Sequence, residues 1–304
     1  MTVYELKTMQ ICEIKGKTAV ALGTFDGCHA GHFSVLQSAF YKAKELGVKS
    51  VAYTFDTSEA KGQALIMSLE EKIKAIAKFG IDYVAVESFD TVRNLSGEEF
   101  VSSVLQGKLG AAFAVCGFNY RFGKNALCDA SDLRAFFEKS GGSVHVCDQV
   151  NYNGEAVSST LIRRKIEKGE VEDILSYSRP YSIYATVERG KGLGARHGVA
   201  TINQQIPKGK VVPATGVYIT ECEIGEDVYP AVTNVGYRPT TDGENSFLNV
   251  ETHIIGRDLD LYGERISVKL ASYIRGEQKF EKIEDLKAAI AKDIETAKKE
   301  YESK

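Results

Sequence analysis

Short apolar runs alternate with stretches of helical periodicity through the first half of the chain. The runs rich in strand-forming residues lie at 18–22, 49–55, 83–86, 112–116 and 143–147. The first helical stripe follows the first run and consists of Val35, Leu36, Ala39, Phe40, Ala43 and Leu46. Apolar residues spaced by three or four positions form one face of an amphipathic helix. This alternation predicts an α/β domain with a doubly wound parallel sheet.

Two capping boxes mark where further helices of this domain begin. Ser68 and Glu71 frame one, and Ser96 and Glu99 frame the other. We expect Gly80 to end the first of these helices. The second should bury Phe100, Val101, Val104 and Leu105, and a further helix is predicted over 131–138.

The pattern changes near Arg179, where short alternating strands replace the helical period. Strand-like segments at 182–187, 216–222, 247–254 and 266–270 are separated by many glycines. They predict a small antiparallel β-barrel. A helical period returns over 283–301, with lysines and glutamates on a solvated face. The chain is therefore predicted to hold two domains, 1–181 and 182–304.

Charge, apolar runs and cysteine content indicate which partners and which cellular location to expect. The formal net charge of −3 argues against a dominant interaction with nucleic acid or an anionic membrane. The segment 1–17 is mixed and polar, unlike a signal peptide, and no apolar run is long enough to span a membrane. Six cysteines are scattered without a C-x-x-C pair, which is typical of reduced thiols. We expect a cytoplasmic protein with small-molecule substrates, no nucleic-acid or membrane partner, and a monomeric or weakly oligomeric state.

The stretch from Gly23 to His32 carries the strongest chemical pattern. It lies where the first strand turns into the first helix, and its sequence is G-T-F-D-G-C-H-A-G-H. Its glycines let the backbone approach a ligand, and the coming helix N-terminus favours an anion. Two imidazoles, His29 and His32, can donate hydrogen bonds to phosphate oxygens and, if protonated, offset negative charge. A metal cluster with Cys28, or a structural turn with incidental histidines, are the alternatives.

Two further stretches are phosphate or ring candidates. The loop Gly117 to Gly123 opens at the same sheet edge, and its Asn119 and Phe122 fit a pocket wall; an ordinary aromatic loop is the alternative. Ser159 is expected to cap the helix that contains Arg163. An arginine in a first turn opposes the helix dipole, and a bound polyphosphate would remove this conflict. A plain surface arginine is the alternative.

The predicted barrel offers oxygen ligands on alternating positions. Thr201 and Asn203 should share one strand face, as should Glu251 and His253. Hydroxyl, amide and carboxylate oxygens suit Mg²⁺, and Glu251 is a candidate general base. Backbone N–H groups of a glycine-rich segment could contact a phosphate, at Gly190, Lys191 and Gly194. Alternating polar residues that merely face water are the alternative.

Taken in order, these stretches resemble the prokaryotic bifunctional riboflavin kinase/FMN adenylyltransferases, also called FAD synthetases. The family's G-x-F-D-G-x-H-x-G-H, G-x-N/D-F-x-F-G and S-S-T-x-I-R motifs are similar to 23–32, 117–123 and 158–163. Its G-F-P-T-A-N, N-x-G-x-R-P-T, E-x-H and R-x-E-x-K-F stretches are similar to 198–203, 234–240, 251–253 and 275–280. The departures are Val199 and Ala200 for the aromatic residue and proline, and Ala195 and Ala126 where arginines are usual.

The resemblance implies two reactions that use ATP and Mg²⁺. The barrel would phosphorylate riboflavin to FMN, with Glu251 as base and Thr201 and Asn203 holding Mg²⁺. The first domain would adenylylate FMN to FAD and release pyrophosphate, with His29, His32 and Arg163 stabilising charge. The resemblance also implies nucleotide or flavin binding by Gly23, Phe25, Asp26, Gly27, Asn119, Phe122, Ser159, Thr160, Gly190, Lys191, Gly194, Thr201, Asn203 and Arg238.

Two other functions fit the same residues. The barrel could have lost catalysis and serve as a flavin-binding or docking module, which the substitutions at Val199 and Ala200 motivate. A cytidylyltransferase with an appended barrel that binds RNA or protein would use the same H-x-G-H chemistry. The stretches around Arg238 and Glu251 argue against the cytidylyltransferase.

Overall fold

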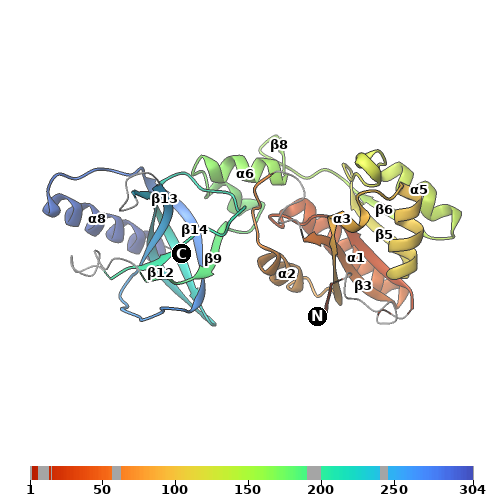
Figure 1. The fold of residues 1–304 in the computed structure, drawn as a ribbon, viewed down its shortest axis with the longest axis horizontal. Helices are drawn as coiled ribbons and strands as arrows, with labels where there is room; N and C mark the ends of the chain where they lie inside the picture. The colour runs from red at the N-terminus through yellow and green to blue at the C-terminus, as the bar shows by residue number, and fades with distance from the viewer. Residues whose placement is uncertain are drawn as a thin grey trace. The chain divides into compact units, whose positions relative to one another are not determined.

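The chain folds into two compact units, Met1–Leu161 and Ile162–Lys304. The computed structural model describes residues 2–5, 14, 16–56, 63–189, 200–239 and 246–303, shown as ribbon in Figure 1. The predicted functional boundary at 181/182 lies later in the chain than this division. Ile166 and Tyr181 precede the predicted boundary but bond to residues of the second unit. The Ala214 amide donates to the Ile166 carbonyl, and the Leu270 amide donates to the Tyr181 carbonyl. The functional boundary stays a prediction.

The first unit is built on a six-stranded parallel sheet, in the order β1-β4-β3-β2-β5-β6. Its strands are β1 (Thr2–Glu5), β2 (Thr18–Leu22), β3 (Lys49–Asp56), β4 (Tyr83–Ser88), β5 (Ala111–Gly117) and β6 (Ser143–Cys147). All five predicted strands are confirmed. The additional strand β1 pairs with β4 at the edge of the sheet.

The strand order reverses between β2 and β5. From β2 the chain moves through β3 to β4 on one side, then crosses to β5 and β6 on the other. Such a reversal opens a crevice beyond the carboxyl ends of the two central strands. The stretches that begin at Gly23 and Phe118 follow β2 and β5, so both candidate loops start at this position.

Helices flank the sheet as the periodicity predicts. They are α1 (Ala30–Leu46), α2 (Leu69–Ala77), α3 (Phe89–Val92), α4 (Gly97–Glu99), the π-helix η1 (Phe100–Lys108), the 3₁₀ turn η2 (Lys124–Ala126) and α5 (Ala130–Lys139). Both capping boxes are confirmed, and the four apolar residues predicted for the second helix are buried. Leu46 is an exception in α1: it is the last helical residue and is 46 % exposed.

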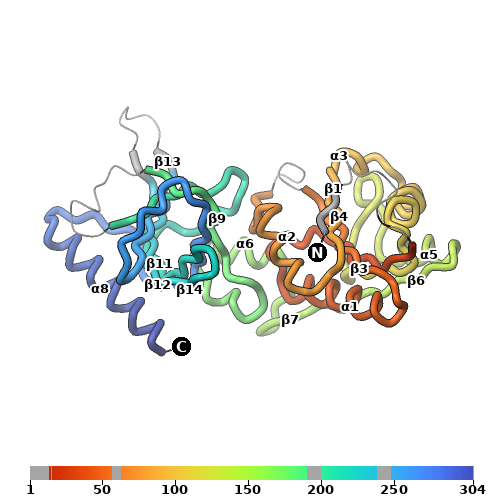
Figure 2. Tube along the Cα trace, turned by 90° about the horizontal axis from the view of Figure 1, so that it is seen from below, coloured from red at the N-terminus to blue at the C-terminus, as the bar shows by residue number. Residues whose placement is uncertain are grey.

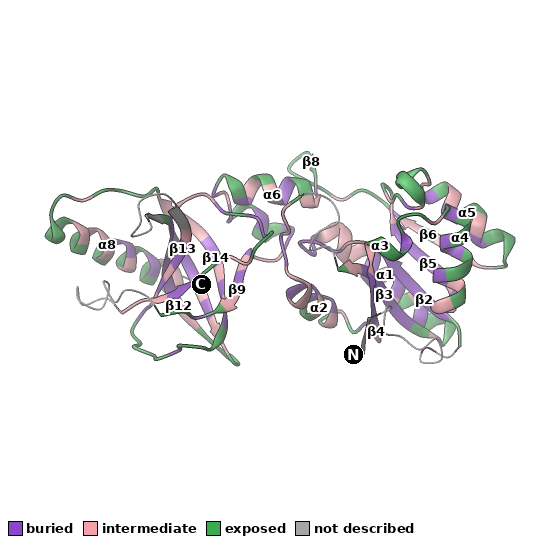
Figure 3. Cartoon of the chain, in the orientation of Figure 1, coloured by how far each residue is buried: buried purple, intermediate pink, exposed green. Residues whose placement is uncertain are grey.

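One hydrophobic cluster joins a face of the sheet to η1 and α5. Alternate residues of β2 and β3, including Leu22 and Tyr53, pack with Phe100, Leu105 and Phe137. The purple strands and green outer helix faces of Figure 3 show this separation of core and surface. Helix α1 packs against β2, β3 and β5. The predicted doubly wound fold is confirmed.

The second unit is a six-stranded antiparallel barrel, in the order β10-β13-β12-β11-β14-β9. Its strands are β9 (Ser182–Thr186), β10 (Ile202–Gln204), β11 (Gly216–Ile224), β12 (Asp227–Pro239), β13 (Ser246–Ile254) and β14 (Arg265–Arg275). A bridge between Glu188 and Asn203 joins the two end strands, with the Glu188 amide donating to the Asn203 carbonyl at 2.8 Å. The predicted barrel is confirmed.

Three short elements complete the description: the hairpin strands β7 (Asn151–Tyr152) and β8 (Glu155–Ala156), and the 3₁₀ turn η3 (Asp173–Ser176). Helix α6 (Ser159–Glu167) runs across the division between the units. The C-terminal helix α8 (Ile283–Glu302) lies along the barrel, as the tube in Figure 2 shows. Val217, Ile219 and Ala297 are among the residues that pack between barrel and helix. Arg275 of β14 forms a two-contact ion pair with the buried Asp293 of α8 (3.1 and 2.7 Å).

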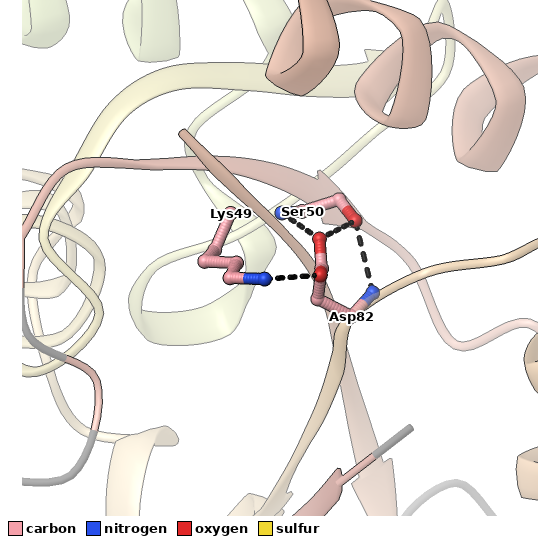
Figure 4. A network of polar contacts seen from close by, with 3 residues as sticks. All are labelled: Lys49, Ser50 and Asp82. Atoms are coloured by element: carbon pink, nitrogen blue, oxygen red, sulfur yellow. Dashed lines mark hydrogen bonds and ion pairs between the residues drawn. The ribbon is translucent and has the colours of Figure 1, made fainter. Parts of the chain in front are cut away.

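A network of polar contacts joins the amino-terminal ends of β3 and β4, at the edge of the parallel sheet opposite the candidate loops (Figure 4). The Asp82 carboxylate accepts from Lys49 Nζ at 2.8 Å, and from the Ser50 amide and hydroxyl at 2.9 and 2.8 Å. The Asp82 amide donates to Ser50 Oγ at 2.9 Å. This exchange fixes the start of β3 against the turn that enters β4. Burial opposes the charge, but the hydrogen bonds from Lys49 and Ser50 outweigh it and lower the pKa of Asp82.

We expect Asp82→Ala to reduce the free energy of unfolding of the first unit by about 1–3 kcal/mol, since hydrogen bonds to a charged group are lost. Because the folded-state pKa is lowered, this contribution is present above the ordinary aspartate pKa and is lost as the pH falls through the lowered value. Thermal unfolding by circular dichroism at pH 7 measures it. Asp90→Ala is the control, because the Asp90 side chain is 80 % exposed and, among the described residues, pairs with Arg93 at the surface. Equal shifts for the two variants would contradict the assignment.

Candidate active sites

The loop between β2 and α1 has a strained backbone. Phe25, Gly27 and Cys28 all have positive φ, at 50°, 85° and 40°. Only glycine adopts such angles at little cost, so the surrounding structure must hold the other two in place. Phe25 is fully buried, and its ring lies edge-on to the His32 ring at 5.5 Å. This loop is therefore built to hold its side chains in one arrangement.

Hydrogen bonds from three other segments hold this loop in place. The buried Asp26 carboxylate accepts from the amides of Ile66 and Met67 at 3.0 Å. Ser159 Oγ donates to the Asp26 carbonyl at 2.7 Å, and Thr54 Oγ1 donates to the Thr24 carbonyl at 3.0 Å. Asp26 and Ser159 thus position the loop, which is a structural contribution that the sequence pattern alone did not distinguish from ligand binding.

His29 is the N-cap of α1. Its Nδ1 accepts from the His32 amide at 3.4 Å, so Nδ1 carries no proton and Nε2–H is the donor. The two imidazole rings stack with their centroids 3.7 Å apart and their planes 20° apart. The first turn of α1 contains no acidic residue to compete with an anion. The geometry presents ring N–H groups and the positive end of a long helix at one place.

Both histidines are neutral near pH 7. Burial lowers the pKa of His29 to about 4. Burial, and then the positive charges possible on His29 and Lys72, hold the pKa of His32 well below its ordinary value. The sequence left open that the imidazoles are protonated; the structure instead makes them neutral hydrogen-bond donors. Within the described residues no group of three or more His, Cys, Asp or Glu side chains is arranged for a metal, and Cys28 Sγ points to the Phe25 carbonyl at 3.3 Å.

The loop after β5 exposes only one of the two side chains expected there, Asn119 and not Phe122. Phe122 is 7 % exposed and packs in the hydrophobic core beside Phe100 and Tyr120. A ring so enclosed offers little surface to a ligand. Asn119 is exposed, and the neighbouring Phe118 is 49 % exposed. Phe118 is therefore the aromatic side chain of this loop that is accessible, although the sequence pattern favoured Phe122.

Helix α6 begins one residue earlier than predicted. Ser158 Oγ accepts from the Leu161 amide at 3.2 Å, so Ser158 is the N-cap and Ser159 the first helical residue. The prediction of Ser159 as the cap is wrong, because its hydroxyl is engaged with the Asp26 carbonyl. Thr160 is exposed in the first turn, and Arg163 follows the division between the units. Phosphate binding by Thr160 and Arg163 stays a prediction.

A polar row crosses three strands of the barrel. Glu251 of β13 lies opposite Asn203 of β10 on one side and Asn234 of β12 on the other. Asn249 Nδ2 donates to Glu251 Oε1 at 3.0 Å and approaches Asn203 Oδ1 at 3.4 Å. Thr252, which lies between Glu251 and His253 in β13, is 1 % exposed and hydrogen-bonded to Thr233. Because neighbouring residues of a strand point to opposite faces, Glu251 and His253 face away from Thr252. The row brings Asn203 and Glu251 together, as expected from the sequence.

Two residues near this row, Asn249 and His253, make contacts that the sequence did not predict. Asn249 was not singled out, although the alternation N-V-E-T-H over 249–253 places it on the same face as Glu251. His253 Nδ1 donates to the Ala200 carbonyl at 2.8 Å, which ties the segment before β10 to β13. Thr201 is half-buried in that segment. Gly190, Lys191 and Gly194 lie outside the described residues, and Arg238 is described only as part of β12.

Comparison with known proteins assigns both units. A family model described as FAD synthetase matches residues 11–161, and one described as riboflavin kinase matches residues 177–301. A bifunctional riboflavin kinase/FMN adenylyltransferase from Listeria monocytogenes is 31 % identical over 285 residues, with 90 % of this chain and 89 % of that protein covered. The chain belongs to the bifunctional riboflavin kinase/FMN adenylyltransferase family.

Other members of this family are similarly related. The proteins of that name from Pseudomonas fluorescens and Escherichia coli are 32 % and 31 % identical, over 91 % and 92 % of this chain and 91 % of each relative. A crystal structure described as a macrolide-efflux protein from Streptococcus pneumoniae has a TM-score of 0.85, 26 % identity, and coverage of 97 % of this chain and 98 % of that one. In the described parts of our chain, no helix is long and apolar enough to cross a membrane.

The neutral state of His29 makes a prediction about pH. The unfolded chain takes up a proton near pH 6.5, whereas the folded imidazole does so only near pH 4, so folding should lose stability as the pH falls through this window. We expect a loss of up to about 2 kcal/mol at pH 5. His29→Gln should remove this part of the pH dependence, measured as the melting temperature at pH 7.5 and pH 5.0. An identical pH dependence in both proteins would show that His29 is not buried in its neutral form.

Proposed function

We propose that the two units catalyse successive reactions. The barrel phosphorylates riboflavin with ATP to give FMN, and the α/β unit transfers AMP from a second ATP to FMN, giving FAD and pyrophosphate. The observation that carries the second reaction is the stacked pair of neutral imidazoles at the N-terminus of α1, at the reversal of the strand order. The polar row around Glu251 carries the first.

The geometry of the H-x-G-H loop suits adenylyl transfer. An FMN phosphate oxygen attacks the α-phosphorus of ATP, and pyrophosphate leaves with its bonding electrons. The attacking oxygen is already ionised, so the site needs no strong base. His29 and His32 donate hydrogen bonds to oxygens that gain charge, and the dipole of α1 adds to this effect. Gly23 and Gly27 let the backbone approach the phosphates, while Asn119 and Arg163 contact ATP or FMN.

The barrel reaction requires a base. The riboflavin hydroxyl attacks the γ-phosphorus of ATP and Glu251 accepts its proton, while the bond from the γ-phosphorus to the bridging oxygen breaks and ADP leaves with the bonding electrons. Asn249 donates to Oε1 of Glu251 and thereby restrains the carboxylate. The E-x-H strand therefore supplies both a base and, through His253 and Ala200, a fixed entry to β10.

The donor set fits Mg²⁺ bound together with ATP. Asn203 provides a buried amide oxygen, and Thr201 a hydroxyl in the adjoining segment. Mg²⁺ usually takes only one or two protein oxygens besides waters and substrate phosphates, so a small set is sufficient. When bound, Mg²⁺ supplies charge neutralisation for the ATP phosphates. Gly190, Lys191, Gly194 and Arg238 are proposed to contact the nucleotide or flavin.

A specific observation favours catalysis over a docking role for the barrel. The segment that lacks the family's proline carries Ala200, whose carbonyl accepts a hydrogen bond from His253. This contact restrains the backbone where a proline would restrain φ. We also propose that the protein acts in the cytoplasm on small molecules, as a monomer or weak oligomer without a nucleic-acid or membrane partner.

Incubation with riboflavin, ATP and Mg²⁺ tests the proposal directly. FMN should appear first and FAD should follow, as resolved by chromatography over time. A parallel incubation that starts from FMN tests the second step alone. FAD formation from FMN without FMN formation from riboflavin would support the docking alternative. Preference for CTP over ATP would support a cytidylyltransferase.

His29→Ala and His32→Ala should each reduce FAD formation from FMN by about 10²–10³, the usual effect of losing one charge-stabilising donor. FMN formation from riboflavin should stay unchanged, because Glu251 and its neighbours belong to the other unit. Steady-state rates of both reactions, measured on the same preparation, give the comparison. His145→Ala is the matched control, since this histidine of β6 is exposed. Equal loss of both activities would contradict the separate assignment.

Glu251→Gln should reduce riboflavin phosphorylation by about 10²–10⁴, because the amide cannot accept the hydroxyl proton. FAD formation from supplied FMN should persist. Riboflavin binding, followed by fluorescence quenching, should also persist, because the carboxylate acts on the hydroxyl and not on the ring. Glu226→Gln in the exposed turn between β11 and β12 is the control. A Glu251→Gln enzyme with the wild-type kinase rate would exclude Glu251 as the base.

A further inference from the structure

Lys72 of α2 is a buried lysine that the reaction scheme above does not use. It is 1 % exposed, whereas Lys74 two positions later has a side chain that is 59 % exposed and pairs with Glu70. Lysine is almost never fully buried, because its ammonium loses strong hydration. An ammonium buried inside the α/β unit must therefore be stabilised by specific contacts.

The Lys72 ammonium lies at the carboxyl end of β3. Its Nζ donates to the Phe55 carbonyl at 2.9 Å and to Thr54 Oγ1 at 3.4 Å. Thr54 Oγ1 in turn donates to the Thr24 carbonyl at 3.0 Å. Each donor polarises the next, so one continuous path of hydrogen bonds runs from the ammonium to the loop that carries His29. The Thr54 side chain that links the ammonium to the Thr24 carbonyl is fully buried.

The position of the charge matters as well as the path. The positive charge of Lys72 lies near enough to His32 to oppose protonation of its imidazole. His32 Nδ1 is buried and has no hydrogen-bond partner among the described residues. A fixed cation whose field reaches a neutral, partly unsatisfied imidazole raises the electrostatic potential where the transferring phosphate gains charge. The imidazoles can then act as neutral donors while the lysine provides the positive charge.

We propose that Lys72 is a positioning residue of the adenylyl-transfer site, which holds the β2–α1 loop against the end of β3 through Thr54 and whose positive charge acts on His32. This inference rests on the proposed adenylyl transfer in the α/β unit. It assigns Lys72 no contact with substrate: it acts through Thr24 and His32.

Lys72→Met keeps the length of the side chain and removes the charge and the donor. FAD formation from FMN should show a kcat lowered about 10- to 100-fold, the effect of a small displacement of catalytic groups, with KM for FMN little changed. The acidic limb of its pH profile should move to higher pH, because His32 is protonated more easily without the neighbouring cation. Riboflavin phosphorylation, measured on the same sample, should stay at the wild-type rate.

Three further variants separate positioning from general destabilisation. Thr54→Val breaks the path but keeps the charge, so kcat should fall about fivefold, the value of one hydrogen bond, with the acidic limb unmoved. Lys72→Arg keeps the charge and should also leave the acidic limb in place. Lys74→Met removes the same charge from the exposed side of α2 and should match the wild type in every respect.

The outcomes distinguish the possible failures. Wild-type kcat and pH profile in Lys72→Met would overturn the proposal, as would a loss of both activities together with an unmoved acidic limb. If Lys72→Met does not fold, a wild-type kcat in Thr54→Val would overturn it. A wild-type enzyme that forms no FAD from FMN would instead refute the proposed function, before any variant is compared.

Discussion

The proposed adenylyl-transfer site depends on the hydrogen bonds of the buried Asp26 carboxylate. By accepting from the Ile66 and Met67 amides, it joins the strained loop after β2 to the segment that leads into α2. The Asp26 carbonyl meanwhile accepts from Ser159 at the start of α6. Three segments distant in the sequence therefore meet at one residue. Without this joint, the positive φ angles of Phe25 and Cys28 would relax, and the stacked histidines would lose their common position.

The arrangement of the first unit could be predicted because its pattern is local. Alternating apolar runs and helical stripes define five parallel strands, and the capping boxes at Ser68 and Ser96 define where two helices begin. The edge strand β1 was missed, since its four residues show no apolar run. The π-helical form of 100–108 was missed too, because α- and π-helices bury the same side chains at this spacing.

The candidate sites could be predicted by their motifs, but the part each residue plays could not. A motif places Phe25, Asp26, Phe122 and Ser159 near the ligand; only tertiary packing shows that two are core rings and two are anchors. The charge state of His29 likewise depends on burial, which no local pattern encodes. Lys72 and Asn249 carry no motif at all. Their importance comes from two contacts. Lys72 of α2 donates to Thr54 of β3, and Asn249 donates to Glu251, which lies two positions later in β13.

Asn203 takes part in two contacts of the barrel, one through its backbone and one through its side chain. Its backbone carbonyl accepts the Glu188 amide at the seam that closes the sheet, and its side chain belongs to the polar row around Glu251. Anything that engages the side chain therefore also bears on the seam. If the nucleotide that we propose to bind at Asn203 binds the closed barrel more tightly, thermodynamic linkage requires that closure strengthens nucleotide binding to the same degree. The Glu188–Asn203 bridge would then couple occupancy of the proposed kinase site to closure of the sheet.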